Sequence, residues 1–533
     1  MKPRVLVIGL DGHEPSAFEW LNRHNHLPNL ARLAERSARF QLDHGPAVRT
    51  GLAWEQFITG LSPDDAQKWA AVSFDPATYR VWQEGTTLVP FPAKLTTRTV
   101  VFDPPYLDLA KAPEVRGVVA WGAHDPGVSH AANPPGLLDE LAARGLGYPA
   151  PKDIYGISWQ SVEETTQMGR RLARAVDARS TAARWLFEKR LPDWDLALVV
   201  VSELHSAVEG LWHGIDRNHP LHGRAPSTKA AGLGLLAVYA AVDRLVGNLV
   251  EAFPDAIVIA FTMNGMGINH SDNASMMLLP ELLFRHTFGR TRMRLQGPKG
   301  PNPEMPILAE DQGWGALMRT ILPDPPNLEP FVNTTNPRRL SLDWMPATRY
   351  RPYWPRMLAF ALPSFYDGRV RINLAGREAQ GIVPIERFAA VRLEISRLVR
   401  DCRNSITGEP AVRAVEPPST PDPRRLQETE SDLTFVWNGP TLGLDHPRLG
   451  RIGPMPFRRP GGHSGRYGMM WVAGPGVPSG DVGVTSSFDV APTIVDLLGQ
   501  PPVAGMSGRS LLRPGGAQRL AVAADRGDGV RTA

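Results

Sequence analysis

Residues 5–12 read VLVIGLDG, an apolar run that ends in a short polar turn. The unbroken apolar run from Val5 to Leu10 predicts a strand buried on both faces of a parallel sheet, because a half-buried strand would alternate apolar and polar residues. The turn begins at Asp11, and apolar residues with helical spacing follow from Ser16, with a break near Pro28. A strand, a polar turn and a helix in this order form the start of a βα unit.

The same order returns along the chain. Residues 196–201 and 256–261 are further aliphatic runs, and residues 228–253 have the apolar spacing of a long helix. Residues 469–473 predict a fourth strand, and residues 489–498 predict a last helix. Strands that alternate with helices predict an α/β fold, with a mostly parallel sheet covered by helices on both faces.

Two long stretches, residues 66–192 and 276–454, interrupt this alternation. The second is rich in Pro, Arg and Trp, which indicates excursions and loops around the core, where a substrate cap could lie. After Pro514 the chain is rich in Gly, Ala and Arg and lacks apolar periodicity. We therefore expect one α/β domain over residues 1–515 with two large insertions, and a disordered tail over residues 516–533.

The composition is that of a globular protein. Of the 533 residues, 42% are hydrophobic and 21% are charged, which excludes wholesale disorder. The formal charge of +4 is too small to indicate binding to a nucleic acid polymer. The single cysteine, Cys402, excludes an intrachain disulfide framework and a cysteine-rich zinc module, and fits a reducing compartment.

The N-terminal segment suggests a location. Its apolar run reaches Asp11 too soon for a signal peptide, and no stretch approaches the roughly 20 apolar residues that cross a bilayer. We expect a cytoplasmic protein that binds no membrane, and the sequence leaves its oligomeric state open.

Polar side chains cluster just past the ends of the predicted strands. Asp11 follows the first strand, His205 and Glu209 follow the second, Asn264 follows the third, and His463 lies in a Gly-rich loop before the fourth. Ligands of open parallel sheets bind beyond the carboxyl ends of the strands, so we expect these side chains to converge. Converging imidazole and carboxylate groups are what a divalent metal site requires.

Six segments of the chain resemble a known family when taken together. They are VIGLDG at 7–12, LPNL at 27–30, TGLAWEQFITG at 50–60, GH at 462–463, GPGV at 474–477 and DVAPT at 489–493. In this order they resemble the type I phosphodiesterase/nucleotide pyrophosphatase group of the alkaline phosphatase superfamily. The resemblance implies an alkaline-phosphatase-like core in which Asp11 and His463 bind metal and Thr50 is the nucleophile. It leaves both insertions mostly uncovered.

One departure from the family concerns the first metal. The family supplies an Asp and a His four residues apart, whereas this chain has His205 and Glu209 at the same spacing. In a helix, residues four apart lie on one face. Together with His463 they would give two imidazoles and one carboxylate, a set that suits zinc, manganese or iron.

A second departure concerns the second metal. Where the family has an Asp-His pair after the third strand, this chain has Met263 and Asn264. A thioether is a poor ligand for such a dication, and Asn offers only a neutral oxygen. Asp11, Thr50 and Asn264 are what remains for this metal, unless His270 or Asp272 takes a missing place. We expect one divalent ion rather than two, Zn²⁺ in the first place and Mn²⁺ or Fe²⁺ as alternatives.

Other interpretations of single residues stay open. Asp11 could cap the helix that starts near Ser16. His205 and Glu209 could serve on the surface or as caps. The segment WGAHDP at 121–126 suggests His124 and Asp125 as substrate-binding residues from the first insertion, although such a segment can also be a packed turn.

The resemblance implies a metal-dependent hydrolase of phosphodiester or phosphomonoester bonds, with sulfate esters as a further possibility. The Thr50 oxygen would attack a small anionic ester while the metal neutralises charge. One alternative is a degenerate member that binds an anionic ligand or a partner, which the Met263-Asn264 pair favours. Another is a phosphoryl or sulfuryl transferase in biosynthesis, which would keep the same residues.

Overall fold

A nine-stranded sheet forms the centre of the computed structural model, which describes residues 4–123, 128–155, 158–294, 304–331, 336 and 338–511. In spatial order the strands are β21 (Gly480–Ser486), β2 (Ala38–Asp43), β20 (Tyr467–Ala473), β9 (Ile257–Thr262), β1 (Val5–Leu10), β8 (Leu196–Val201), β5 (Thr99–Phe102), β6 (Arg116–Val119) and β7 (Ala131–Asn133). The tail over residues 516–533 lies outside the described residues.

The middle of the sheet is parallel and fully buried. Strands β9, β1, β8, β5 and β6 run parallel, with Val5 opposite both Leu196 and Ile257. Every residue of β1, β8 and β9 is buried. The predicted strands and helices differ from the observed ones by at most two residues at either end. Strand β20, however, runs antiparallel to both of its neighbours, which an apolar run cannot reveal because burial does not depend on strand direction.

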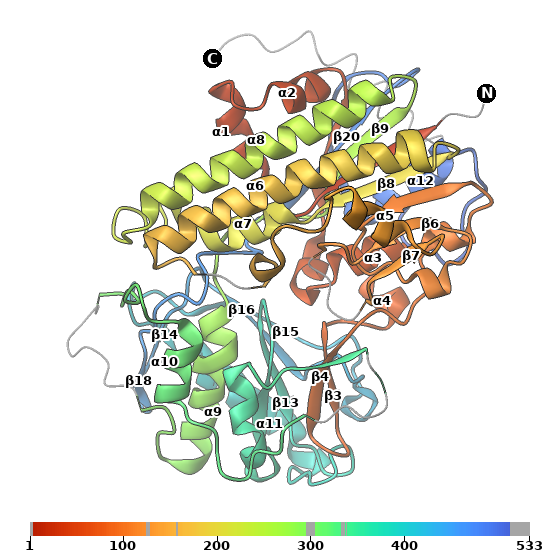
Figure 1. Cartoon of the computed structure of the whole chain (residues 1–533). Helices are drawn as coiled ribbons and strands as arrows, with labels where there is room; N and C mark the ends of the chain where they lie inside the picture. The colour runs from red at the N-terminus through yellow and green to blue at the C-terminus, as the bar shows by residue number, and fades with distance from the viewer. Residues whose placement is uncertain are drawn as a thin grey trace, which may run out of the picture.

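Helices cover both faces of this sheet. Leu6 and Ile8 of β1 point into one core and Val5 and Val7 into the other, as alternation along a strand requires. The first core is covered by α1 (Pro15–Arg23), α2 (Pro28–Glu35), α6 (Val162–Trp185), α7 (Glu203–Leu211) and α8 (Thr228–Ala252), of which α6 and α8 are the two long helices lying side by side in Figure 1. The second core is covered by α3 (Ala53–Thr59) and α12 (Val490–Leu497). The predicted α/β architecture is confirmed.

Helix α8 corrects one expectation from the sequence. Among the described residues it is the one helix that is long and apolar enough to cross a membrane, and more than half of its most apolar window is buried within the fold. Leu235, Val242 and Leu249 are fully buried in the core beneath α6 and α7. A core helix meets the same length and hydropathy criteria, and the packing of α8 accounts for its composition.

The stretch 276–454 builds a second lobe with its own core, below the central sheet in Figure 1. Its sheet has the order β12 (Ala359–Leu362), β13 (Gly368–Ile372), β16 (Leu433–Trp437) and β15 (Val412–Glu416), and its helices are α9 (Leu279–Phe288), α10 (Trp314–Ile321) and α11 (Ile385–Arg400). The stretch 66–192 is divided between the lobes. It adds β5 to β7 and α6 to the central layer, and its hairpin β3 (Val72–Asp75) and β4 (Arg80–Glu84) pairs with β11 (Arg339–Ser341).

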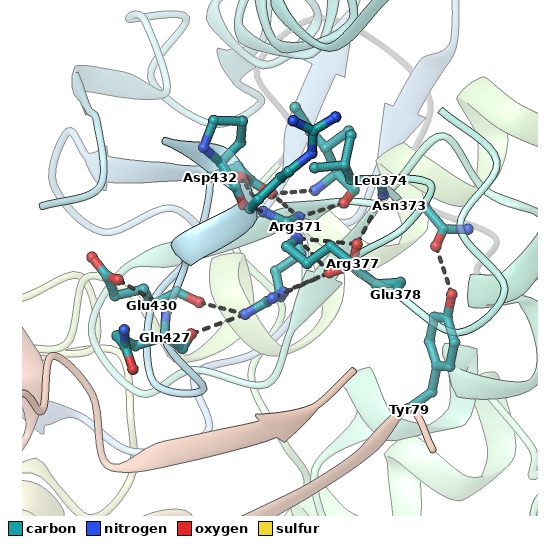
Figure 2. A network of polar contacts seen from close by, with 12 residues as sticks. Tyr79, Arg371, Asn373, Leu374, Arg377, Glu378, Gln427, Glu430 and Asp432 are labelled. Carbon is teal, nitrogen blue, oxygen red and sulfur yellow. Dashed lines mark hydrogen bonds and ion pairs between the residues drawn. The ribbon is translucent and has the colours of Figure 1, made fainter. Parts of the chain in front are cut away.

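A buried polar network stabilises the second lobe (Figure 2). Arg371 and Arg377 both bond to Glu378, and Arg377 also bonds to Asp432. The Tyr79 hydroxyl, from the loop between β3 and β4, donates to Asn373 Oδ1 at 2.6 Å. Two guanidinium groups face two carboxylates, so this network is balanced in charge, and we assign it a structural role.

Buried histidines should make the fold sensitive to acid. Burial lowers the pKa of His13, His44 and His219 to about 4 and that of His213 to about 3. Below pH 6.5 the unfolded chain binds protons that the fold excludes, so this part of the stability is present above pH 6.5 and is lost as the pH falls toward 4. The buried carboxyls of Asp103 and Asp272, whose pKa values burial raises, act in the opposite direction.

His13 isolates this effect, because neither of its ring nitrogens has a hydrogen-bond partner. For His13→Leu we expect the free energy of unfolding to fall less steeply between pH 6 and 4.5, by about 1.4 kcal/mol per pH unit relative to wild type. Urea unfolding at several pH values measures this slope. The same change at exposed His24 is the control and should leave the slope unaltered.

Candidate active site

A cavity of about 450 Å³ lies between the central sheet and the second lobe. Asp11, His205, Glu209, Asn264 and His463 all line it. The carboxyl ends of β1, β8 and β9 meet there, as expected for an open parallel sheet. The second lobe supplies the opposite wall, with Leu340, Trp344, Phe365 and Tyr366.

Helix α7 presents His205 and Glu209 together. It starts directly after β8, and the spacing of four places both buried side chains on one face. His205 Nδ1 lies 3.0 Å from Asp11 Oδ2, and His205 Nε2 lies 3.2 Å from Glu209 Oε1. Gly12 has a φ of +82°, and a Cβ there would lie 2.4 Å from His205 Cα. Glycine after Asp11 thus lets the first loop approach the start of α7.

His463 completes the group from a third segment of the chain. It follows β19 (Gly461–Gly462), which pairs with β10 (Gly267–Ile268). Its Nε2 lies 3.2 Å from His205 Nε2, and its Nδ1 lies 3.2 Å from Asn264 Nδ2. The Tyr366 ring of the second lobe packs edge-on against the imidazole.

The pKa values of Asp11 and His463 are both shifted by the surroundings of the site. Burial alone would raise the pKa of Asp11, but the charge and hydrogen bond of His205, with a bond from Trp54, hold it below its ordinary value. Burial and the neighbouring His205 lower the pKa of His463 well below the usual range, so it is neutral at pH 7. Because the Asn264 amide N–H points at His463 Nδ1, the neutral His463 ring carries its proton on Nε2 and donates it to His205 Nε2. Glu209 Oε1 lies beside the same nitrogen and is paired with the Arg459 guanidinium.

The two imidazoles that face each other in the cavity are nitrogen donors of the kind that metal ions use. Two nitrogen ligands of a tetrahedral zinc ion lie about 3.3 Å apart, close to the 3.2 Å between the two Nε2 atoms. The bond from His205 Nδ1 to Asp11 is the usual outer contact of a metal-binding imidazole. As the side chains stand, no group of three or more His, Cys, Asp or Glu in the described part of the chain is arranged to hold a metal. Arg459 contacts Glu209 Oε1, so an ion would have to replace that contact.

Arg458 and Arg459 are site residues that the sequence interpretation missed. Both line the cavity and bond to Asp272, and burial lowers the pKa of Arg459 to about 9, which leaves it charged at pH 7. Asp272 is thus engaged by two guanidinium groups, and neither it nor His270 lines the cavity. The available signal was a pair of arginines shortly before the Gly-Gly-His loop.

Thr50 has a different position from the other predicted residues. It is buried and does not line this cavity but a second one, of about 380 Å³, together with Arg49. Its Oγ1 donates to Ala47 O at 2.8 Å and accepts from Leu52 N at 3.1 Å and Gln56 Nε2 at 3.0 Å. The hydroxyl therefore uses its proton and both lone pairs within the fold.

The remaining candidates are placed as follows. The side chain of Glu14, rather than that of Asp11, caps α1 by accepting from Ser16 N. His124 and Asp125 lie outside the described residues. The turn just before them is fixed at Trp121, whose backbone N–H donates to Asp103 at 2.7 Å.

A buried ion group behind the site holds the start of α7. Arg179 of α6 bonds to both carboxylate oxygens of Glu203, the first residue of α7, and to Asp103, and all three side chains are fully buried. For Arg179→Met we expect a loss of about 3–5 kcal/mol in the free energy of unfolding, because two buried carboxylates would lose their counter-charge. Urea unfolding measures this loss.

Arg244→Met is the matched control. Arg244 pairs with Asp177 in a half-exposed surface contact, so the expected loss is below about 1 kcal/mol. Equal losses in the two variants would contradict the assigned role of the buried group.

Comparison with known proteins gives one family and several distant structural likenesses. The family model described as type I phosphodiesterase / nucleotide pyrophosphatase matches residues 5–270, about half of the chain. No curated protein sequence matches. Phosphonoacetate hydrolase from Sinorhizobium meliloti 1021, in complex with phosphonoformate, is 14% identical with a TM-score of 0.48, covering 93% of this chain and 96% of its own. Murine ectonucleotide pyrophosphatase / phosphodiesterase 5 is 11% identical with a TM-score of 0.44, covering 94% and 96%.

Proposed function

Because the chain belongs to the type I phosphodiesterase/nucleotide pyrophosphatase family of hydrolases, we propose that it hydrolyses the phosphoester bond of a small anionic substrate in the cavity around His205. The observation that carries this proposal is the meeting of Asp11, His205, Glu209 and His463 in one cavity. These four residues come from three separate segments of the chain. Buried ionisable side chains with shifted pKa values that converge at a cavity wall are typical of functional sites.

The first part of the proposal concerns the metal. One divalent ion, Zn²⁺ in the first place and Mn²⁺ or Fe²⁺ as alternatives, would be held by His205, Glu209 and His463. When bound it would supply positive charge that polarises the phosphoryl group. A second ion would find only the Asp11 carboxylate and the Asn264 amide, because Met263 contributes no oxygen or nitrogen ligand.

The second part of the proposal concerns the protein groups that act on the substrate. Asp11 keeps the His205 ring in place by accepting from Nδ1. The Thr50 oxygen is proposed as the nucleophile, which requires its side chain to leave Ala47 O and turn toward the cavity that its neighbour Gly51 lines. The hydroxyl proton would then need an acceptor at the cavity wall.

The aromatic lining guides the choice of test substrates. Trp54, Tyr106, Tyr155, Trp344 and Phe365 surround the polar group, and such rings suit a planar apolar substituent on the ester. Turnover of an aryl phosphodiester, an aryl phosphomonoester and an aryl sulfate should therefore be compared, with Zn²⁺, Mn²⁺ or Fe²⁺ added. We expect turnover of at least one phosphate ester, and product analysis with an added alcohol separates hydrolysis from transfer.

A second candidate function is favoured by a specific observation. The Thr50 hydroxyl is fully engaged within the fold, and Met263 and Asn264 stand where the family supplies metal ligands. Both features suit a member that binds an anionic ligand without turning it over. Tight phosphate binding by a folded protein that turns over none of the three esters would favour this second function.

The surroundings in which the protein acts are also part of the proposal. We propose a cytoplasmic location and partners limited to small anionic esters, without a nucleic acid polymer or a membrane. The single, buried Cys402 and the small net charge support this.

A further inference from the structure

Arg459 is held in the cavity wall through one edge of its planar guanidinium group, formed by Nε and Nη2. Nε donates to Asp272 Oδ2 at 2.7 Å and Nη2 donates to Asp272 Oδ1 at 3.3 Å. Asp272 is itself only 1% exposed, so the carboxylate that grips Arg459 is fixed by the surrounding fold. This side-on pairing leaves Nη1 directed away from Asp272.

Nη1 points at the polar group of the site. It contacts Glu209 Oε1, the same oxygen that lies 3.2 Å from His205 Nε2. The Glu209 carboxylate oxygen therefore accepts from Nη1 at a point beside the imidazoles. A reacting phosphoryl group would place its own anionic oxygen near the same point.

Arg458 shares the same anchor. Its Nη1 donates to Asp272 Oδ2 at 2.8 Å, and its guanidinium lies 4.9 Å from the centre of the Trp344 ring. Arg458 and Arg459 thus share Asp272, and Glu209 is the second carboxylate that balances their charge. A guanidinium group with a fixed fork matches the oxygens of a tetrahedral oxyanion.

We propose that Arg459, positioned by Asp272, binds the tetrahedral oxyanion of the substrate, and that in the metal-free protein Glu209 occupies its Nη1 until the oxyanion arrives. The substrate class, phosphate or phosphonate esters, rests on the proposed function. The binding role of Arg459 does not, because it can be measured with inorganic phosphate and without turnover.

The test is isothermal titration of the purified full chain with inorganic phosphate in the presence of a chelator. For Arg459→Lys we expect the Kd for phosphate to rise about tenfold or more. Lysine keeps the positive charge, but its single nitrogen cannot pair side-on with Asp272 and also donate to the bound phosphate. The retained charge against Glu209 and Asp272 also preserves the fold, which a thermal melt checks. Arg451→Gln, at an arginine that pairs with Asp445 outside the cavity, is the control and should bind phosphate as wild type does.

A second variant separates Arg459 from the general charge of the site. Glu209→Gln should lower the Kd for phosphate about fivefold to tenfold, because Nη1 is released and one negative charge is removed. In the double variant with Arg459→Lys, most of this gain should disappear. An equal gain in both backgrounds would show that Glu209 acts only through its charge and would overturn the exchange at Nη1.

The remaining outcomes also decide the proposal. An unchanged Kd in Arg459→Lys, or no measurable binding of phosphate by wild type, overturns it. Phosphate binding that depends on Arg459, without turnover of any ester, would retain the binding role while rejecting the proposed hydrolysis. Turnover of an ester, together with phosphate binding that does not depend on Arg459, would retain the proposed hydrolysis and reject the binding role of Arg459.

Discussion

His205→Ala should lower kcat/KM for the preferred phosphate ester by about a thousandfold or more. His205 contacts Asp11, Glu209 and His463 at once, so its loss removes the contact on which the whole group converges. Losses of about 10²–10⁴ are typical when a single group that handles protons in a reaction is removed, and groups that act as a unit lose more. Steady-state kinetics with the ester identified in the substrate panel measures the effect.

The control for this variant is His24→Ala, at the exposed histidine that directly follows α1. It should keep wild-type kinetics. A thermal melt of His205→Ala must show a folded protein for the comparison to count. A folded His205→Ala variant with more than a tenth of wild-type kcat/KM would place the reaction elsewhere in the molecule.

Thr50→Ala should lower kcat by about a thousandfold while the Kd for inorganic phosphate stays within about twofold of wild type. A nucleophile contributes to the chemical step and little to ground-state binding, so kcat and Kd should separate. Thr50→Ser, which keeps a hydroxyl, should retain part of the rate. Single-turnover kinetics and phosphate titration measure the two quantities on the same samples.

Thr59→Ala is the matched threonine control, because Thr59 is also buried, donates to a backbone oxygen and does not line the cavity. It should leave kcat close to wild type. Near-normal turnover in Thr50→Ala would agree with the saturated hydrogen bonding of this hydroxyl. In that case a water molecule, rather than Thr50, would attack the ester.

Much of the central layer could be predicted from the sequence. Strands such as β1 and β8 are apolar throughout because they are buried on both faces, and this pattern depends on few other parts of the chain. The approach of Asp11, His205, Glu209 and Asn264 follows from the meeting of strand ends in a parallel sheet. His463 lies beside these residues because the glycines that precede it let its loop approach α7 and the segment around Asn269 closely.

Other parts depend on contacts that no local pattern encodes. The side-on pairing of Asp272 with Arg459 joins residues 187 positions apart, and neither residue belongs to one of the six segments that resemble the family. The antiparallel direction of β20 against β9 is not encoded in its own residues, because a buried strand is apolar in either direction. The engagement of the Thr50 hydroxyl depends on Gln56, one turn into α3, which carries no signal as a neighbour of a nucleophile.

The measurement that tests the account most directly is hydrolysis of an aryl phosphodiester by the wild-type protein, after complete removal of metal and during stepwise return of Zn²⁺. The account predicts no turnover in the metal-free protein and a rise in rate that saturates at one ion per chain, because His205, Glu209 and His463 supply ligands for one ion. It would be contradicted by a folded protein that binds phosphate but shows no turnover at any zinc ratio. A rate that needs two ions per chain would equally contradict the assignment of the donor set.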